Sequence, residues 1–454
     1  MTNYKEYFKG KKGVIMGLGL MGGGLGDAKF LLDCGANLTI TDLKSEKELA
    51  PSIKKLQSTK YNLQSTKFVL GRHDLADFKQ ADFIIQPGNV PVDSPYLLEA
   101  IKNNIPIYES ESLFMEQAEN VKVIGVTGTR GKTTTTTLIY EILKLAFGKR
   151  VHLGGNIRGT SALSMLTKIK AGDMVVLELD SWCLHGIGEI KKSPQISVFT
   201  NIMPDHLNFY LKGSKDQAEA MQKYFTDKAQ IYLNQKPEDY LICGEKIAEE
   251  IGQIKSHKIV VNKNTVSKAW KIKIPGEHNL ENIACAIAVA RVLKIDEKII
   301  KKAVENFIGV DGRLQFIKEY KGIRIYNDTT ATTPDATIMA LKALAPSDNL
   351  QSTNYNKLIL IMGGADKGID PAGLLKEIPK YCKEVFLLDG TGSNKINIKN
   401  AFKCNSLKEA VNQAIKQCKK GDILLFSPAF ASFGMFKNEY DRGDQFDALI
   451  KKLK

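Results

Sequence analysis

The chain has 454 residues, a length that favours about three domains. Hydrophobic residues make up 43% and charged residues 25%, which is ordinary for a globular protein and excludes wholesale disorder. The formal charge is +14, but only 8 of the 64 basic residues are Arg and the lysines are spread along the chain, so the charge suits small anionic ligands, or a solvated surface without a partner, as well as it suits a nucleic acid.

The first hundred residues alternate short apolar runs with helical patterns. GVIMGLG from Gly13 predicts a buried strand that enters a turn, and AKFLLDCG from Ala28 predicts a helix that ends at Gly35. The runs NLTITD and ADFIIQPG, the second beginning at Ala81, predict further strands. Alternation of strands and helices is typical of a parallel sheet.

The same alternation starts twice more. VKVIGVTG from Val121 predicts a strand, followed by a Gly-rich turn and the helix TTTTTLIYEILKLAF, and DMVVLELD and QISVFTN continue this unit. After the turn GVDGRLQ, the strands GIRIYND, KLILIMGG and DILLFSP form a third unit. We therefore expect an α/β protein of three domains, with boundaries near residues 108 and 308, giving 1–108, 109–308 and 309–454.

Several other classes of protein are not supported. The N-terminal segment has no apolar signal-peptide region, and no stretch approaches the 18 apolar residues of a membrane span. The 7 cysteines are dispersed, odd in number and without a CxxC pair, which predicts reduced thiols in a cytoplasm. The run LQST occurs from Leu56, Leu63 and Leu350 and is interpreted as loop insertions without function.

The strongest motif is VTGTRGKTT, from Val126 to Thr134. Glycines let backbone N–H groups converge on phosphate oxygens, a Lys neutralises the β- and γ-phosphates, and a Thr hydroxyl binds Mg²⁺, all at a helix N-terminus. Gly131, Lys132 and Thr133 meet these requirements, although the usual first glycine of the pattern falls at Val126. The alternative is a chance Gly- and Thr-rich turn.

A second glycine motif, GLGLMG, spans Gly17 to Gly22 after the first strand, and Asp42 ends the next strand. This arrangement would place a diphosphate on a helix N-terminus and a ribose hydroxyl on the carboxylate. The motif does not distinguish a nicotinamide cofactor from another nucleotide. Glycines that merely allow close helix–strand packing are the alternative.

Two further candidates follow strands of the middle unit. Glu178 ends DMVVLEL, where a carboxylate could hold a nucleotide-bound Mg²⁺. His206 lies in the turn after QISVFTN, at the ligand edge of a parallel sheet. A surface His beside a turn-stabilising Asp205 is the alternative, because Mg²⁺ prefers oxygen ligands.

In combination, these motifs resemble the Mur ligase family over essentially the whole chain. The motifs occur in the family's order: TGTRGKTT, LELDSW, TNIMPDHLNFY, GEHNLENIACA, YNDTTATTPDA, GGADKG and SPAFASFGMFKNEYDRG. The order and the last motif most resemble the branch that adds D-glutamate to UDP-N-acetylmuramoyl-L-alanine in peptidoglycan precursor synthesis. The resemblance implies Rossmann-like first and third domains around a central P-loop ATPase domain.

The resemblance also implies the reaction, in which ATP activates the alanyl carboxylate as an acyl phosphate that the glutamate amine attacks. It implies ATP, two Mg²⁺ ions and these small-molecule substrates as the only partners, with no nucleic acid or membrane and a monomeric chain. The catalytic and metal-site residues implied are Lys132, Thr133, Glu178, His206 and Lys228, the last of which aligns with a lysine that many members carbamylate.

The resemblance assigns three sets of binding residues. Those for ATP are Thr127, Gly128, Thr129, Arg130, Gly131, Lys132, Thr133, Thr134, Asn279, Asn282, Arg313 and Asp328. Those for the UDP substrate are Leu20, Met21, Asp42, Leu43 and Asn156, and those for the amino acid are Thr332, Lys367, Ser432 and Phe433.

Four departures from the family pattern leave the acceptor amino acid open. Thr330 stands where a lysine is usual, Glu439 where an aromatic residue is usual, Arg130 where Asn is common, and DSWC from Asp180 replaces SSFQ. A sister ligase that uses L-glutamate or another amino acid is therefore the first alternative. Folylpolyglutamate synthase is disfavoured by the GLGLMG-bearing first unit. A nicotinamide-dependent oxidoreductase and a non-catalytic P-loop module are alternatives of other classes.

Overall fold

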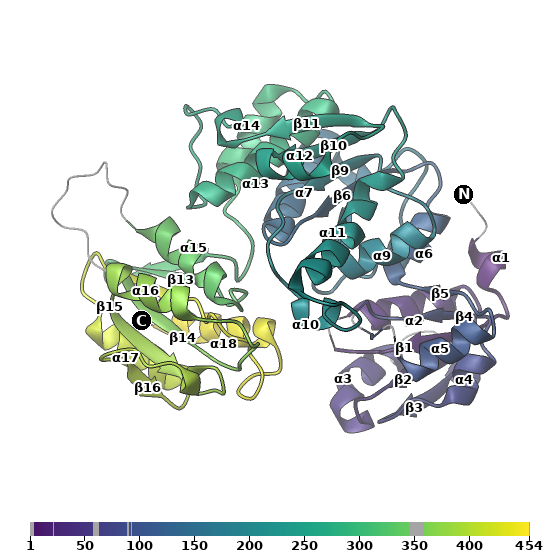
Figure 1. Cartoon of the computed structure of the whole chain (residues 1–454), viewed down its shortest axis with the longest axis horizontal. Coiled ribbons are helices and arrows are strands. Elements are labelled where there is room, and N and C mark those ends of the chain that lie inside the picture. Colours follow the sequence, from purple (N-terminus) through teal and green to yellow (C-terminus); the bar gives the residue numbers. More distant parts are fainter. Residues whose placement is uncertain are drawn as a thin grey trace. The chain divides into compact units, whose positions relative to one another are not determined.

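The structure, a computed structural model, describes residues 4–20, 22–57, 63–88, 90–91, 93–345 and 358–453. Three mostly parallel sheets follow one another along the chain (Figure 1), which confirms the predicted α/β class. The chain forms two compact units. Unit 1 comprises Met1–Ser267 and Glu281–Ala303, and unit 2 comprises Lys268–Leu280 and Val304–Lys454.

The N-terminal sheet of unit 1 has five parallel strands in the order β3-β2-β1-β4-β5. Its central strand carries the buried apolar run predicted from Gly13, because helices cover both faces of such a sheet. The strands are β1 (Lys12–Met16), β2 (Asn37–Asp42), β3 (Lys67–Leu70), β4 (Phe83–Ile85) and β5 (Ile107–Tyr108), and the helices are α1 (Tyr4–Phe8), α2 (Gly23–Asp33), α3 (Glu46–Gln57), α4 (Leu75–Lys79), α5 (Pro95–Lys102) and α6 (Ser110–Gln117).

The second sheet of unit 1 has six parallel strands in the order β11-β10-β9-β6-β8-β7. The strands are β6 (Lys122–Thr127), β7 (Val151–Gly155), β8 (Met174–Glu178), β9 (Ile196–Phe199), β10 (Tyr240–Gly244) and β11 (His257–Val261). The helices are α7 (Lys132–Phe147), α8 (Ala162–Met165), α9 (Ser181–Glu189), α10 (Leu207–Tyr210), α11 (Gln217–Leu233) and α12 (Glu245–Ile251). Two further helices, α13 (Glu277–Val292) and α14 (Glu297–Asn306), each have residues in both units.

A buried carboxylate joins the two sheets of unit 1. Asp27 on α2 accepts hydrogen bonds from the hydroxyls of Ser110 (2.8 Å) and Ser161 (2.7 Å). Ser110 is the first residue of α6, and Ser161 is the N-cap of α8. Burial outweighs both bonds and raises the pKa of Asp27 to about 6. Because α2 also packs on α8, the first two predicted domains fall within one compact unit.

The sheet of unit 2 has six strands in the order β12-β13-β17-β14-β15-β16, parallel except for the β12–β13 hairpin. The strands are β12 (Gln315–Tyr320), β13 (Ile323–Asn327), β14 (Leu358–Gly363), β15 (Cys382–Leu388), β16 (Phe402–Cys404) and β17 (Ile423–Phe426). The helices are α15 (Pro334–Leu344), α16 (Ala372–Tyr381), α17 (Leu407–Gln417) and α18 (Glu439–Lys451). Stacking of Phe446 on Phe426, with ring centroids 4.6 Å apart, anchors α18 to the sheet.

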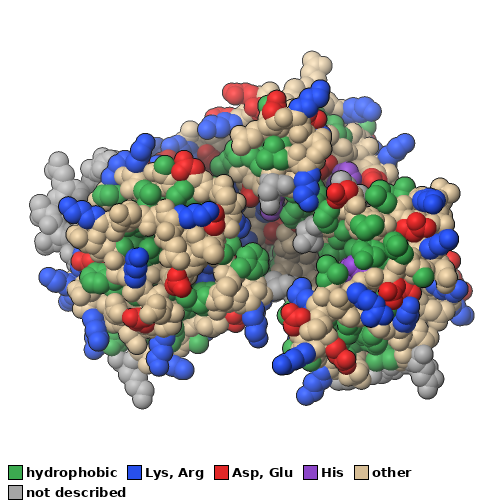
Figure 2. Space-filling model, turned by 60° about the horizontal axis from the view of Figure 1, so that its bottom comes forward, with side chains coloured by type: hydrophobic (Ala, Val, Ile, Leu, Met, Phe, Trp, Pro, Cys, Tyr) green, Lys and Arg blue, Asp and Glu red, His purple; other side chains and the backbone are tan. Residues whose placement is uncertain are grey.

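Other sequence-based expectations concern the surface and the thiols. All seven cysteines are free, and all except the half-buried Cys418 are buried. Among the described residues, no helix is long and apolar enough to cross a membrane. Lys and Arg side chains lie dispersed among acidic and neutral ones on the face in Figure 2. The first LQST run begins with the last two residues of α3 and continues outside the described residues. The second begins with a short 3₁₀ turn, and the third lies outside the described residues.

Candidate functional site

The P-loop connects β6 to α7, as the sequence predicted. Gly128 (φ 143°) and Gly131 (φ 80°) adopt backbone conformations that other residues rarely take. A side chain at Gly128 would overlap the Thr200 hydroxyl, and one at Gly131 would overlap the Asn282 amide. The glycines therefore serve close approach as well as the turn, and Asn282, a predicted ATP residue, lies against the loop.

Lys132 begins α7, and its ammonium lies over the loop. Its Nζ donates to the carbonyl oxygens of Gly128 (3.0 Å) and Thr129 (3.1 Å). The next residue, Thr133, is buried in the first turn of α7. A cation and a hydroxyl at a helix N-terminus are suited to polyphosphate and its metal ion.

Residues after β9 hold the other side of the loop. The Asn201 side chain accepts from the Arg130 N–H (2.8 Å), and Thr200 donates to the Arg130 carbonyl (2.6 Å). The Arg130 guanidinium also pairs with Asp205 at 3.1 Å. Sequence reasoning missed Thr200 and Asn201, although both follow a predicted strand end. It considered Asp205 only as a turn residue, and this carboxylate does accept from the His206 N–H (3.0 Å).

Glu178 ends β8 and is 3% exposed. It lies opposite Val126 of β6 in the parallel register, beside the start of the P-loop. The backbone carbonyl of Glu178 accepts from the N–H of Asn156 (2.8 Å). Asn156, which is predicted to contact the UDP substrate, is therefore its neighbour. A buried carboxylate therefore lies at the same end of the sheet as α7, which carries the Thr133 hydroxyl. Such oxygen donors suit Mg²⁺.

His206 lies at the same end of the sheet in a left-handed conformation (φ 54°). Its ring centroid is 4.6 Å from that of Trp182. Trp182 belongs to the segment DSWC, in which the chain departs from the family pattern, and this residue packs directly on His206. Burial lowers the pKa of His206, Asp205 opposes this shift, and the charge of Lys132 adds to it. The neutral imidazole that results is the form that can bind a metal.

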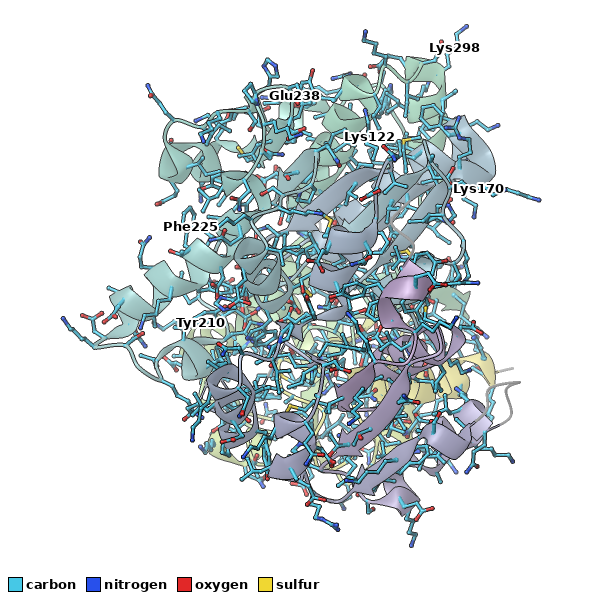
Figure 3. All side chains as sticks on the ribbon, turned by 90° about the vertical axis from the view of Figure 1, so that its right-hand side faces the viewer. Lys122, Lys170, Tyr210, Phe225, Glu238 and Lys298 are labelled. Carbon is cyan, nitrogen blue, oxygen red and sulfur yellow. The ribbon has the colours of Figure 1, made fainter. Side chains whose placement is uncertain are left out.

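Lys228 is not one of the many surface lysines, because it is 1% exposed on α11. Its Nζ donates to the Gly128 carbonyl (2.9 Å) and the Thr127 hydroxyl (3.4 Å), and it lies 4.8 Å from the Tyr224 ring centroid. Burial, and secondarily the charge of Lys132, holds its pKa well below the usual range. Figure 3 shows α10 and α11, which carry the labelled Tyr210 and Phe225, at one side of the central sheet.

The carboxylate of Asp42 is hydrogen-bonded to the N-terminal glycine loop. One oxygen of its carboxylate accepts from the Gly19 N–H (3.0 Å), and the other accepts from the Lys44 N–H (2.9 Å). Leu20 and Leu43 expose 41% and 68% of their surface, as expected of side chains available to a ligand. Met21, the remaining predicted UDP-binding residue of this loop, lies outside the described residues.

The remaining predicted residues belong to unit 2. Lys367, exposed after β14, donates to the Thr332 hydroxyl (3.0 Å), which follows β13. Ser432 is buried after β17, and its neighbour Phe433 is 67% exposed. These four candidates for the amino acid thus lie in loops that leave one edge of a parallel sheet, where ligands of such sheets bind.

Three predicted ATP residues also belong to unit 2. The Asn279 amide donates to the Pro275 carbonyl (2.7 Å), and the Arg313 N–H donates to the Val310 carbonyl (3.1 Å). Asp328 is buried and accepts from the Leu314 N–H (2.9 Å) and the Ser427 hydroxyl (2.8 Å). Asn279 and Asn282, although on one helix, therefore belong to different units.

The titration of Asp328 should be visible in the stability of unit 2. Burial raises its pKa to about 7, against 3.8 for an ordinary Asp. Between about pH 4 and 7 the folded protein then binds more protons than the unfolded chain, so the free energy of unfolding falls as pH rises. Denaturant titrations should show that Asp328→Asn removes this decline. An unchanged pH dependence would contradict the assignment, and Asp335→Asn, a change in the first turn of α15, is the control.

Together, the doubly wound sheets and the P-loop define a nucleotide-dependent α/β protein. The Mur ligase middle domain matches residues 126–268, and the Mur ligase glutamate ligase domain matches residues 312–430. The chain belongs to the Mur ligase family.

Curated relatives match along nearly the whole chain. It is 35% identical to a UDP-N-acetylmuramoylalanine–D-glutamate ligase of Borreliella burgdorferi (strain ZS7), covering 97% of each chain. It is 34% identical to the enzyme of the same name from Roseiflexus sp. (strain RS-1), covering 98% of this chain and 99% of that one.

Solved structures of the family share the fold. The UDP-N-acetylmuramate–alanine ligase MurC of Thermotoga maritima matches with a TM-score of 0.61 at 20% identity, over 98% of this chain and all of that one. MurF ligase of Thermotoga maritima in complex with ADP matches with a TM-score of 0.59 at 17% identity, over the whole of both chains.

Proposed function

We propose that the protein joins D-glutamate to UDP-N-acetylmuramoyl-L-alanine in an ATP-dependent reaction of peptidoglycan precursor synthesis. The observation that carries this proposal is the full-length similarity to relatives named for this activity, in a chain whose P-loop retains Lys132 and Thr133. A carboxylate is a poor acyl donor, so the reaction needs ATP to activate it.

In the first step, the alanyl carboxylate attacks the γ-phosphorus of ATP, and the bond to the β,γ-bridging oxygen breaks to release ADP. Lys132 and the N–H groups from Thr127 to Thr134 hold the phosphates, and Asn279, Asn282, Arg313 and Asp328 complete the nucleotide-binding set. Because charge develops on the transferred group, a fixed cation at the loop lowers the barrier.

In the second step, the amine of glutamate attacks the acyl phosphate, loses a proton, and phosphate leaves from the tetrahedral intermediate. Thr332, Lys367, Ser432 and Phe433 receive the amino acid, with the Lys367 ammonium facing a carboxylate. Leu20, Met21, Asp42, Leu43 and Asn156 hold the UDP substrate. Alignment of amine and acyl phosphate supplies much of the acceleration, because it converts a bimolecular step into a local one.

We propose that two Mg²⁺ ions bind beside the loop. Thr133 and Glu178 would hold one of them, and His206 and a carbamylated Lys228 would contribute to the second. Bound Mg²⁺ would neutralise charge on the phosphate oxygens. The lowered pKa of Lys228 supports the carbamate, because only a neutral amine reacts with CO₂.

We further propose three functional domains with boundaries near residues 108 and 308, each containing one of the three sheets. The first domain binds the UDP substrate, the second is the ATPase, and the third receives the amino acid. We also propose that the enzyme is a monomer and works in the cytoplasm, and the free cysteines support the second point.

The test supplies ATP, Mg²⁺ and UDP-N-acetylmuramoyl-L-alanine and compares D-glutamate, L-glutamate and other amino acids. With D-glutamate we expect a product whose mass equals that of the UDP substrate joined to glutamate, and one phosphate released for each product formed. Product with L-glutamate instead would identify a sister ligase. Tight NAD(H) binding without UDP competition would favour an oxidoreductase, and nucleotide binding without amino-acid-dependent phosphate release would favour a non-catalytic module.

A further inference from the structure

Arg442 on α18 is 0% exposed and is the largest fully buried side chain among the described residues. No carboxylate forms a salt bridge with it in the part of the chain that the structure describes. The carboxylate whose charge acts on it is that of Glu439, three residues earlier on α18, and burial outweighs this interaction and lowers the pKa of Arg442. A buried guanidinium that is not held in a salt bridge is costly, and such a group is retained where its hydrogen bonds and its charge are used.

The hydrogen bonds of Arg442 run to two loops. Its Nη2 donates to the Thr329 carbonyl (2.7 Å), its Nε to the Thr329 hydroxyl (3.2 Å), and its Nη1 to the Phe430 carbonyl (3.1 Å). The Thr329 hydroxyl donates in turn to the Glu439 carbonyl (2.8 Å) at the start of α18. The planar guanidinium thus links the loop after β13 to the loop after β17.

The residue after Arg442 makes this arrangement possible. A side chain at Gly443 would come within 2.6 Å of the Thr329 methyl group, so only glycine lets that loop lie against the helix here. The Arg-Gly pair and Thr329 therefore form one packed unit.

The two loops carry the residues proposed to receive the amino acid, namely Thr332 in one loop and Ser432 and Phe433 in the other. They are also joined directly, because the Ala429 N–H donates to the Ala331 carbonyl (2.8 Å). A two-way pairing of Ala431 with Ala365 (2.9 and 3.0 Å) ties them to the loop that carries Lys367. The contacts of Arg442 therefore lie directly behind the amino-acid-receiving loops.

We infer that Arg442 is a positioning residue that fixes these loops and gives them a positive potential selective for an amino acid with an acidic side chain. The inference rests on the proposed function. It deepens that function, because it assigns the choice of an acidic amino acid to a cation behind the loops. The charge acts without contacting the substrate, since the guanidinium is fully buried.

The test compares Arg442→Lys and Arg442→Met with Arg324→Met, a partly exposed change on β13 of the same unit. In Arg442→Met we expect the KM for D-glutamate to rise about tenfold or more, while the KM for ATP changes less than about twofold. The ratio of kcat/KM for D-glutamate to that for D-glutamine should fall as well. Arg442→Lys keeps the charge but loses the planar guanidinium with its several donors. It should therefore raise the KM for D-glutamate and leave the ratio of the two kcat/KM values nearly unchanged.

A purely structural role predicts a different result, with a lower melting temperature and kcat but an unchanged KM for glutamate and an unchanged ratio, and that result would overturn the inference. If Arg442→Met does not fold, Thr329→Val decides the positioning role, because it removes one bond to Arg442 and keeps the charge. An unchanged KM for glutamate in this variant would reject positioning. Wild-type protein without D-glutamate turnover would instead reject the proposed function, so the two failures are distinguishable.

Discussion

Lys132→Ala should lower phosphate release by about two to three orders of magnitude or more, while unit 1 stays folded. The ammonium is the cation that the helix N-terminus places over the P-loop, where it now donates to the Gly128 and Thr129 carbonyls. Removing it takes away the charge that stabilises the transferred phosphoryl group. Phosphate release with ATP, the UDP substrate and D-glutamate measures the effect, and thermal unfolding by circular dichroism checks the fold.

The matched control is Lys144→Ala, an exposed lysine in the last turn of the same helix. It changes the net charge by the same amount without reaching the loop, so its turnover should equal that of the wild type. Undiminished turnover of Lys132→Ala would remove the P-loop from the mechanism.

The second large effect is expected at Lys228. Lys228→Ala should lose about 100-fold or more in activity, because it removes the amine that would carry the carbamate. Added bicarbonate should not restore activity, since no amine is left to react with CO₂. A short-chain carboxylate such as acetate or propionate should restore part of it by placing an oxygen donor in the space vacated by the side chain.

Two variants separate this role from packing. Lys228→Met keeps most of the side-chain volume, so it should remain folded and inactive. Lys223→Ala removes a half-buried lysine on the same helix that pairs with Glu219 at 3.2 Å, and it should retain full activity. Activity of Lys228→Ala close to that of the wild type would exclude the carbamate.

The P-loop was predictable because its geometry depends on local features. A buried strand, two glycines and the helix that follows them are consecutive in the sequence, from Lys122 to Phe147, and both glycines adopt positive φ. The same holds for Glu178, because the last residue of a buried parallel strand necessarily lies at the ligand edge.

The contributions of tertiary packing were not predictable. Nothing in YFTDKAQIY distinguishes Lys228 from an exposed lysine, because its burial depends on contact with a loop about a hundred residues earlier. Arg442 is similar, since its partners Thr329 and Phe430 come from different strand ends. For these two residues the sequence alone supplied at most a family correspondence.

The number of compact units was also beyond local reasoning. Length and the three strand–helix series predict three domains, and the chain has three sheets. The hydroxyls of Ser110 and Ser161 converge on Asp27 and help to hold the first two sheets in one compact unit. Short edge strands such as β5, with two residues, and β16, with three, carry too little periodicity to be recognised.

The protected thiols have a practical consequence for labelling experiments. Burial raises the pKa of six of the seven thiols to about 11 or 12 and that of Cys183 well above the usual range, so maleimide reagents should react slowly with all of them near neutral pH. A cysteine introduced at an exposed position should therefore react first. The wild-type background would then allow a dye or spin label to be attached to one chosen unit, without first removing any native cysteine.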